Sequence, residues 1–139
     1  MSAVKTAAAN EPLSDSDLID FLLRPDAPDV RKKLPHKKYE IKRLSELTGG
    51  PVVIEVHGLP YGTVKDIQQM PEKEIPVQLI VEGCPFFRNP RLIDLDRSIA
   101  TPEDAVCATL NAGEIEELSI EVEKLSGYRQ TSIAEIKNA

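Results

Sequence analysis

The chain of 139 residues is long enough for one domain with a modest core, and its net charge of −6 argues against a general nucleic-acid-binding protein. Because it has three Phe, three Tyr and no Trp, that core must consist mainly of Leu, Ile, Val and Ala. No apolar run approaches eighteen residues, no charged-then-apolar leader opens the sequence, and two cysteines cannot form a disulfide framework. We therefore expect a cytoplasmic protein with free thiols and no membrane span.

Residues 1–38 are predicted to form a flexible N-terminal arm with one short helix. The first twelve residues are small and polar and lack a repeating apolar face, which indicates a disordered tail. Residues 14–23 predict a helix, because Ser14 or Asp15 can cap it and its apolar residues share one face. That face consists of Leu18, Phe21 and Leu22.

Residues 31–43 form a basic segment that holds seven of the seventeen Lys and Arg residues, with His36 among them. The segment could bind an anionic partner, or it could be a solvated run of charge. It could also steer an acidic partner surface or neutralise the acidic helix predicted at 114–126 of the same chain. A small regulatory or nucleic-acid-binding module that uses this segment is therefore one possible function.

Two runs that alternate apolar and polar residues predict strands, one over Tyr39 to Arg43 and one over Val52 to His57. The linking residues 44–50 end in the glycine-rich turn sequence Thr48-Gly49-Gly50-Pro51. This arrangement predicts a two-stranded antiparallel hairpin. Since an isolated hairpin is marginal in water, we expect helices to cover one of its faces.

The middle of the chain predicts helices separated by an irregular segment. Thr63 can cap a helix that runs to Met70. The apolar run over residues 72–83 suits either a strand, by its β-branched residues, or a buried helix, by Pro76 near its start, and we favour the helix. Two prolines and a glycine within residues 83–90 predict irregular structure, and residues 91–100 predict another short helix.

The clearest pattern in the sequence lies between Cys84 and Tyr128. Thr101-Pro102-Glu103-Asp104 predicts a helix start, with a capping oxygen, a proline at the first position and two carboxylates at the positive end of the dipole. Residues 111–113 predict a corner before a second helix over 114–126. Its apolar seam consists of Ile115, Leu118, Val122 and Leu125. Lys124 in the last turn and Gly127 just after it predict a definite helix stop.

These elements predict an α+β fold that is mostly α-helical, with an N-terminal β-hairpin packed with a C-terminal bundle of short helices. Residues 39–128 are expected to form the single domain. Residues 129–139 are expected to be a flexible tail, in which Ile133 and Ile136 could form a weak amphipathic turn.

The sequence offers no set of residues typical of catalysis or of a cofactor. Neither His36 nor His57 has cysteines or carboxylates at metal-ligand spacing, and no nucleophile elbow or phosphate-binding loop is present. The glutamates of residues 114–126 lie on several helical faces without a histidine beside them. Cys84 and Cys107 are expected to be buried structural thiols. We therefore expect a protein that is not an enzyme and that needs no cofactor or metal.

An ordered series of short motifs runs through about two thirds of the chain, from Tyr39 to Tyr128. The series is Leu44-Ser45-Glu46-Leu47-Thr48-Gly49, Val81-Glu82-Gly83, Asn89-Pro90, Thr101-Pro102-Glu103-Asp104, Ala112-Gly113-Glu114-Ile115 and Leu125-Ser126-Gly127-Tyr128. In this order the motifs resemble the tail assembly chaperones of long-tailed phages and prophages of Gram-positive bacteria, the XkdN-like proteins. Two departures are that Asn111-Ala112 stands where that family commonly has leucine-proline, and that the basic stretch around residues 31–38 has no counterpart.

This resemblance implies a chaperone that coats the tape measure protein, keeps its apolar helices soluble until tail tube subunits replace it, and is absent from the finished particle. Such proteins are often made in two lengths by a ribosomal frameshift, and the longer form implies a contact with the tail tube protein. A slippery codon run at Lys137-Asn138 would be compatible with this.

Six residues are the candidate partner surface on this interpretation. They are Phe86, Phe87, Ile115, Leu118, Val122 and Leu125. Two adjacent phenylalanines in a proline-bounded loop cannot easily both enter one core, so one of them could anchor a partner. The four seam residues could equally serve as core, which a chain this short needs. Self-association through the seam helix is a further expectation.

Overall fold

The computed structural model describes residues 11–26, 34–129 and 133–136, and it divides the chain into two units at the boundary between Lys33 and Leu34. The first unit contains helix α1, Asp15–Leu23. As predicted, Ser14 caps this helix, and its Oγ accepts a hydrogen bond from the amide of Asp17 at 3.1 Å. None of the residues of α1 is buried.

The second unit begins with the predicted antiparallel hairpin. Strand β1, His36–Glu40, pairs with strand β2, Val53–His57. His36 stands opposite His57, and Glu40 stands opposite Val53. β1 starts and ends earlier than predicted, so residues 36–38 belong to the hairpin and not to an arm.

The connection between the strands contains a helix that the sequence analysis missed. This helix, α2, is Lys42–Thr48 and ends at Gly49, whose φ of 80° places it in the left-handed region. Seven residues make only two turns, too few for an apolar period to stand out in the sequence. Ile41 stands at the N-cap of α2, and its amide also bonds to the carbonyl of Val52 at 3.0 Å.

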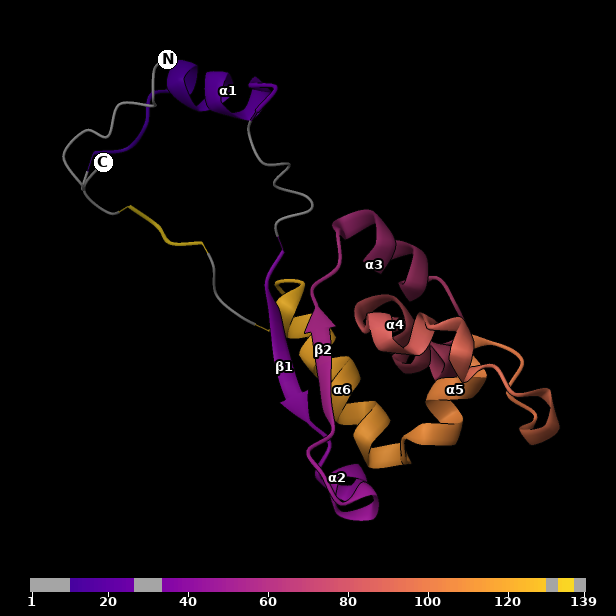
Figure 1. Ribbon diagram of the computed structural model, residues 1–139. Coiled ribbons are helices and arrows are strands. Elements are labelled where there is room, and N and C mark those ends of the chain that lie inside the picture. Colours follow the sequence, from indigo (N-terminus) through magenta and orange to yellow (C-terminus); the bar gives the residue numbers. More distant parts are fainter. Residues whose placement is uncertain (1–10, 27–33, 130–132, 137–139) are drawn as a thin grey trace. The chain divides into compact units, whose positions relative to one another are not determined.

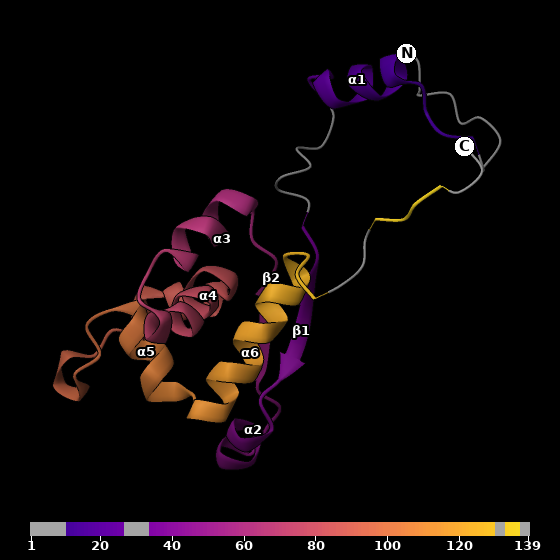
Figure 2. The same ribbon diagram turned by 180° about the vertical axis from the view of Figure 1, so that it is seen from behind.

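The remaining helices form the bundle on which the hairpin rests (Figure 1). They are α3, Tyr61–Gln68; α4, Ile75–Gly83; α5, Pro102–Thr109; and α6, Ala112–Leu125. Helix α4 contacts α3, α5 and α6, and Figures 1 and 2 together show α6 lying along one face of the hairpin. The fold is thus α+β and mostly α-helical, with the hairpin packed on short helices, as predicted.

Short 3₁₀ turns connect these helices. They are η1, Glu72–Glu74; η2, Pro85–Arg88; η3, Pro90–Leu92; and η4, Leu95–Arg97. The predicted helix over residues 91–100 is wrong, because η3, η4 and a bridge between Asp94 and Ile99 occupy this segment. Ser98 adopts a left-handed φ of 62°, which interrupts any regular helix. The predicted helix in residues 72–83 is confirmed from Ile75 onward. The helix predicted to start at a Thr63 cap, α3, begins earlier, with Pro60 at its N-cap.

Local capping bonds fix the ends of the last two helices. The Oγ1 of Thr101 accepts a hydrogen bond from the amide of Asp104 at 3.1 Å, as predicted for α5. Asn111 and Glu114 form a reciprocal capping box, so α6 already begins at Ala112, inside the predicted corner. Gly127 has a φ of 102°, and the amides of residues 127 and 128 bond back to the carbonyls of residues 124 and 123. This is a Schellman motif, and it confirms the predicted stop.

The core lies where α4 and α6 meet each other and the hairpin. Its largest fully buried side chains are Val56, Ile80, Cys84, Phe87, Val106 and Val122. Helices α4 and α6 approach closely at Gly83, where a β-carbon would collide with the side chain of Val122. Residues 133–136 are exposed and show no regular structure, so the weak turn expected there is absent. Three predictions concern residues outside the described ones. They are the N-terminal tail up to residue 10, the basic residues 31–33 and the codon run at 137–138.

Candidate functional site

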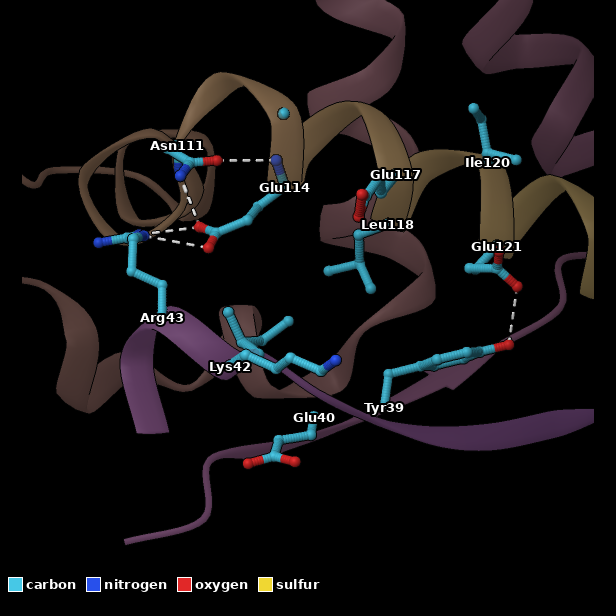
Figure 3. Close-up of a pocket in the computed structure, with 12 residues that line it drawn as sticks. Tyr39, Glu40, Lys42, Arg43, Asn111, Glu114, Glu117, Leu118, Ile120 and Glu121 are labelled. Carbon is cyan, nitrogen blue, oxygen red and sulfur yellow. Dashed lines mark hydrogen bonds and ion pairs between the residues drawn. The ribbon is translucent and has the colours of Figure 1, made fainter. Parts of the chain in front are cut away.

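A groove of about 750 Å³ separates the β1–α2 segment from α6 (Figure 3). Its walls come from parts of the chain about seventy residues apart, and the hairpin brings them together. The lining residues are Tyr39, Glu40, Ile41, Lys42 and Arg43 from the first wall, and Asn111, Gly113, Glu114, Glu117, Leu118, Ile120 and Glu121 from the second.

A bidentate ion pair closes one end of the groove. The Nε and Nη2 atoms of Arg43 donate to the two carboxylate oxygens of Glu114 at 3.0 and 2.8 Å, and Nη2 also donates to the carbonyl of Thr109 at 2.9 Å. The Arg43 guanidinium holds the pKa of the Glu114 carboxyl below its ordinary value. Arg43 thus neutralises a carboxylate of α6, as one interpretation of the basic segment expected.

A second bridge crosses the groove at its other end. The phenol of Tyr39 donates a hydrogen bond to Oε1 of Glu121 at 2.8 Å. Burial raises the pKa of Tyr39, and the neighbouring carboxylate of Glu121 raises it further. The other oxygen of Glu121 lies 3.5 Å from Nζ of Lys124. The two bridging glutamates are seven positions apart on the helix, which corresponds to about 10 Å along α6.

Between the bridges the groove has an apolar floor and a charged rim. Ile41 and Leu118 are buried and form apolar surface at its base, whereas Glu40, Lys42 and Glu117 are exposed. The lining holds four carboxylates, at positions 40, 114, 117 and 121, and two cations, at positions 42 and 43. The side chain of Glu40 lies on the face of the hairpin that points away from α6, because Glu40 stands opposite the exposed Val53 and Tyr39 stands opposite the buried Ile54.

The structure buries most of the seam that the sequence analysis offered as partner surface. Leu118, Val122 and Leu125 lie in the core, and Ile115 is partly buried against it. Their alternative role as core residues is confirmed. Leu118 also contributes the edge of its side chain to the groove.

The two phenylalanines divide as the sequence suggested. Phe87 is 1% exposed and belongs to the core, whereas Phe86 is 45% exposed. Their rings meet edge to face, with centroids 5.1 Å apart. Among the six candidate partner residues, Phe86 is thus the one with a large exposed surface.

The hairpin register assembles a histidine cluster that sequence reasoning missed. Nδ1 of His36 lies 3.4 Å from Glu55, Nε2 of His57 lies 3.1 Å from the same carboxylate, and the two rings stack at 5.2 Å. Hydrogen bonding to His57 lowers the pKa of Glu55. In the part of the chain that the structure describes, no group of three or more His, Cys, Asp or Glu side chains could hold a metal ion. The strand register brings this cluster together, because His36 stands directly opposite His57. A correct prediction of that register would have identified the cluster from the sequence.

The two free cysteines differ in their surroundings. Cys84 is fully buried, and burial raises the pKa of its thiol to about 12. Cys107 lies on α5 and is exposed, so the expectation that it is buried is wrong.

Over residues 11–26, 34–129 and 133–136, no helix is long and apolar enough to cross a membrane. No model of a protein family, no curated protein and no solved structure matches this chain.

Proposed function

We propose that this protein is a phage tail assembly chaperone that binds the tape measure protein and keeps it soluble while the tail tube assembles. It acts in the cytoplasm of the host cell and is absent from the finished particle. On this proposal the protein is not an enzyme, uses no cofactor, and works by reversible contact with helical segments of its partner.

The observation that carries the proposal is the ordered motif series from Leu44 to Tyr128. In the structure two of these motifs form helix ends, the Thr101 cap and the Gly127 stop, and a third forms the capping box of α6. These three motifs are thus capping elements of one folded framework, and the proposal rests on the order of the whole series in the sequence. The groove beside α6 and the exposed ring of Phe86 give this framework surface on which a partner helix can dock.

Co-expression with the tape measure protein of the same genome tests the proposal. We expect a tape measure protein that is insoluble alone to become soluble and to co-purify with this chain. An unrelated acidic protein of similar size serves as the control. If the tape measure protein stays insoluble beside a folded chain, and also beside a frameshifted longer form, the proposal fails.

Phe86 gives a sharper version of this experiment. Phe86→Ser removes an exposed apolar ring, so we expect it to reduce co-purification without unfolding the chain. Leu47→Ser in α2 is the matched control, because Leu47 is also exposed and lies in a different element. Equal recovery with both variants would remove Phe86 from the partner surface.

The structure describes residues 34–43 of the basic segment of residues 31–43. Arg43 is paired with Glu114, while Lys37, Lys38 and Lys42 are exposed. A DNA-binding assay at two salt concentrations tests the alternative regulatory or nucleic-acid-binding module, for which strong and steeply salt-dependent binding would be required.

A further inference from the structure

We propose that α1 is a docking helix, whose apolar face packs on a partner helix that carries lysine or arginine beside its own apolar stripe. The inference rests on the proposed function for the identity of that partner, a helix of the tape measure protein. It adds a contact site on the first unit of the chain and states the chemistry of the partner that fits this site.

The apolar face of α1 is exposed. Helices α3, α4, α5 and α6 each bury residues in the core, whereas α1 buries none. Leu18 and Leu22 stand four positions apart, as do Ile19 and Leu23, so the two pairs form adjacent rows on one side of the helix. Between 44% and 76% of each of these four residues is exposed. An amphipathic helix docks on a partner through rows of this kind.

The length of α1 also favours a partner. A helix of nine residues is marginal in water by itself, because isolated helices shorter than about 12–15 residues form too few backbone bonds. Ser14 caps the first turn, and Asp15 and Asp17 lie at the positive end of the helix dipole. These interactions fix where the helix begins but bury no apolar surface. Packing of the apolar face on a partner would complete the stabilisation of the helix.

The charges of α1 do not balance, and they select a cationic partner. The helix has three aspartates and no Lys or Arg. Arg24, directly after it, donates from Nε and Nη2 to the two carboxylate oxygens of Asp26 at 3.1 and 3.0 Å. Residues 11–26 hold five carboxylates and one arginine, which gives four net negative charges. Lysine or arginine on a partner helix complements this charge, whereas a helix rich in glutamate would be repelled.

Two of the aspartates lie where a neighbouring helix would meet them. Asp15 precedes Leu18 and Ile19 by three and four positions, so it lies at the N-terminal end of the apolar face. Asp20 precedes Leu23 by three positions and therefore borders the face. A lysine or arginine of the partner can reach these carboxylates while its methylene stem covers apolar surface.

Three other occupants fit the face less well. A second copy of α1 would bring the same aspartates without a cation to balance them. Helices that bind a membrane surface carry Lys and Arg toward anionic lipid, so a helix whose only charges are carboxylates would be repelled. Lys37 and Lys38 of the same chain are exposed and can attract the aspartates, but a polar contact of this kind leaves the apolar face uncovered.

The connection between α1 and β1 lets the helix act together with the second unit. Residues 24–35 link the two elements, and a link of this length spans at most about 40 Å when fully extended. Both units can therefore contact one tape measure protein, and each contact raises the effective concentration for the other.

A synthetic amphipathic helix tests the inference. The probe is a fluorescein-labelled peptide of leucine and lysine, and the comparison peptide has glutamate in place of lysine. Fluorescence anisotropy with the full chain should show binding of the lysine peptide, and little or no binding of the glutamate peptide. Hydrogen exchange should show that the amides of residues 18–23 become protected only when the lysine peptide is bound. Protection of these amides in the free chain would show that the chain covers the face itself, and it would overturn the inference.

Matched apolar variants locate the binding. Leu18→Ser with Leu22→Ser removes one row of the apolar face, and we expect about a tenfold loss of affinity for the lysine peptide. Leu47→Ser with Leu95→Ser removes two exposed leucines of the second unit, so it should change the affinity less than about twofold. None of the four leucines is buried, so both variants should unfold as cooperatively as the wild-type chain. Equal losses in the two variants would overturn the inference, as would absence of binding to the wild-type chain.

A charge reversal tests the selection of a cationic partner. Asp20→Lys reverses a charge beside the apolar face without weakening the helix, because lysine has a higher helix propensity than aspartate. We expect it to bind the lysine peptide about fivefold more weakly than the wild-type chain does. Glu46→Lys makes the same change at an exposed residue of α2 and should leave the affinity within about twofold. Equal effects of the two reversals would show that net charge alone attracts the peptide, and they would overturn the inference.

The two apolar variants in the tape measure co-expression separate this inference from the proposed function. Loss of co-purification with the α1 variant alone supports both. If the wild-type chain binds the lysine peptide through α1 but leaves the tape measure protein insoluble, the docking helix stands and the proposed function fails. If the tape measure protein co-purifies equally with both variants, the function stands and the α1 inference fails.

Discussion

Gly58 packs so closely against the end of α6 that a β-carbon at this position would overlap the carbonyl oxygen of Leu125. We therefore expect Gly58→Ala to lower the free energy of unfolding by about 3 kcal/mol, because the hairpin must move away from the helix. Urea denaturation measures this loss. Gly113→Ala is the control, since a β-carbon there meets only the side-chain oxygen of Asn111 at 3.7 Å. It should stabilise the chain by about 0.5–1 kcal/mol. If Gly58→Ala had the same free energy of unfolding as the wild-type chain, the close packing of Gly58 against α6 would be contradicted.

Ser126 links the hairpin to α6 through its hydroxyl group. Its Oγ accepts a hydrogen bond from the amide of Leu59 at 2.8 Å and donates to the carbonyl of Val122 at 2.7 Å. Ser126→Ala leaves the amide of a buried residue without a partner, so we predict a loss of about 1–3 kcal/mol. Ser119→Ala should cost less, because that hydroxyl only donates to a helix carbonyl. Thermal and urea unfolding compare the two variants, and equal losses would assign the Ser126 effect to packing alone.

The pair of Arg43 and Glu114 predicts a pH dependence of stability. The pKa of Glu114 is lowered in the folded chain, so its contribution is complete above the ordinary value of 4.5 and is lost as the pH falls through the lowered pKa. A double-mutant cycle with Arg43→Met and Glu114→Gln should give a favourable coupling at pH 7. This coupling should shrink at pH values below 4.5. A coupling near zero at pH 7 would show that the ion pair does not stabilise the fold, and a coupling that did not change as Glu114 became protonated would show that its charge is not the cause.

The two thiols should react at very different rates. An aromatic disulfide reagent at pH 8 should modify Cys107 quickly, whereas Cys84 should react only after unfolding, because it is buried and its pKa is about 12. We therefore expect one fast thiol per native chain and two in denaturant. Cys107→Ser should remove the fast reaction, and Cys84→Ser should leave it unchanged. Two fast thiols in the native chain would place Cys84 at the surface.

The boundary between Lys33 and Leu34 predicts that the second unit folds without the first. Because α1 contains no buried residue, removal of residues 1–33 should change the free energy of unfolding by less than about 0.5 kcal/mol. Removal of residues 1–40 also deletes β1, and we expect this shorter chain to lose cooperative unfolding. Circular dichroism during urea titration compares the two. A fragment 34–139 that fails to unfold cooperatively would show that α1 supports the core.

The positions of the helix ends could be predicted from the sequence wherever the bonds that fix them are local. The cap at Thr101 and the stop at Gly127 each depend on hydrogen bonds that span three to five residues. Their residue types therefore identify them without knowledge of the rest of the fold. The short α2 and the 3₁₀ turns at residues 90–97 escaped prediction because they are too short to show a period.

The candidate site was beyond sequence reasoning because its parts meet only after the hairpin and α6 have packed. Arg43 and Glu114 are 71 residues apart, and Tyr39 and Glu121 are 82 apart, so no local pattern relates them. The histidine pair likewise depends on the strand register.

By itself, the sequence determined the α+β class, the antiparallel hairpin, the start of α5 and the end of α6, because local hydrogen bonds and apolar periods specify them. Only the tertiary structure decided that Leu118 is core as well as groove floor, that Phe86 and Cys107 face solvent, and where the carboxylates of α6 meet the basic segment. Those outcomes depend on which surfaces are covered when distant segments pack. The residue pattern of a single helix or strand does not show which of its side chains a distant segment will cover.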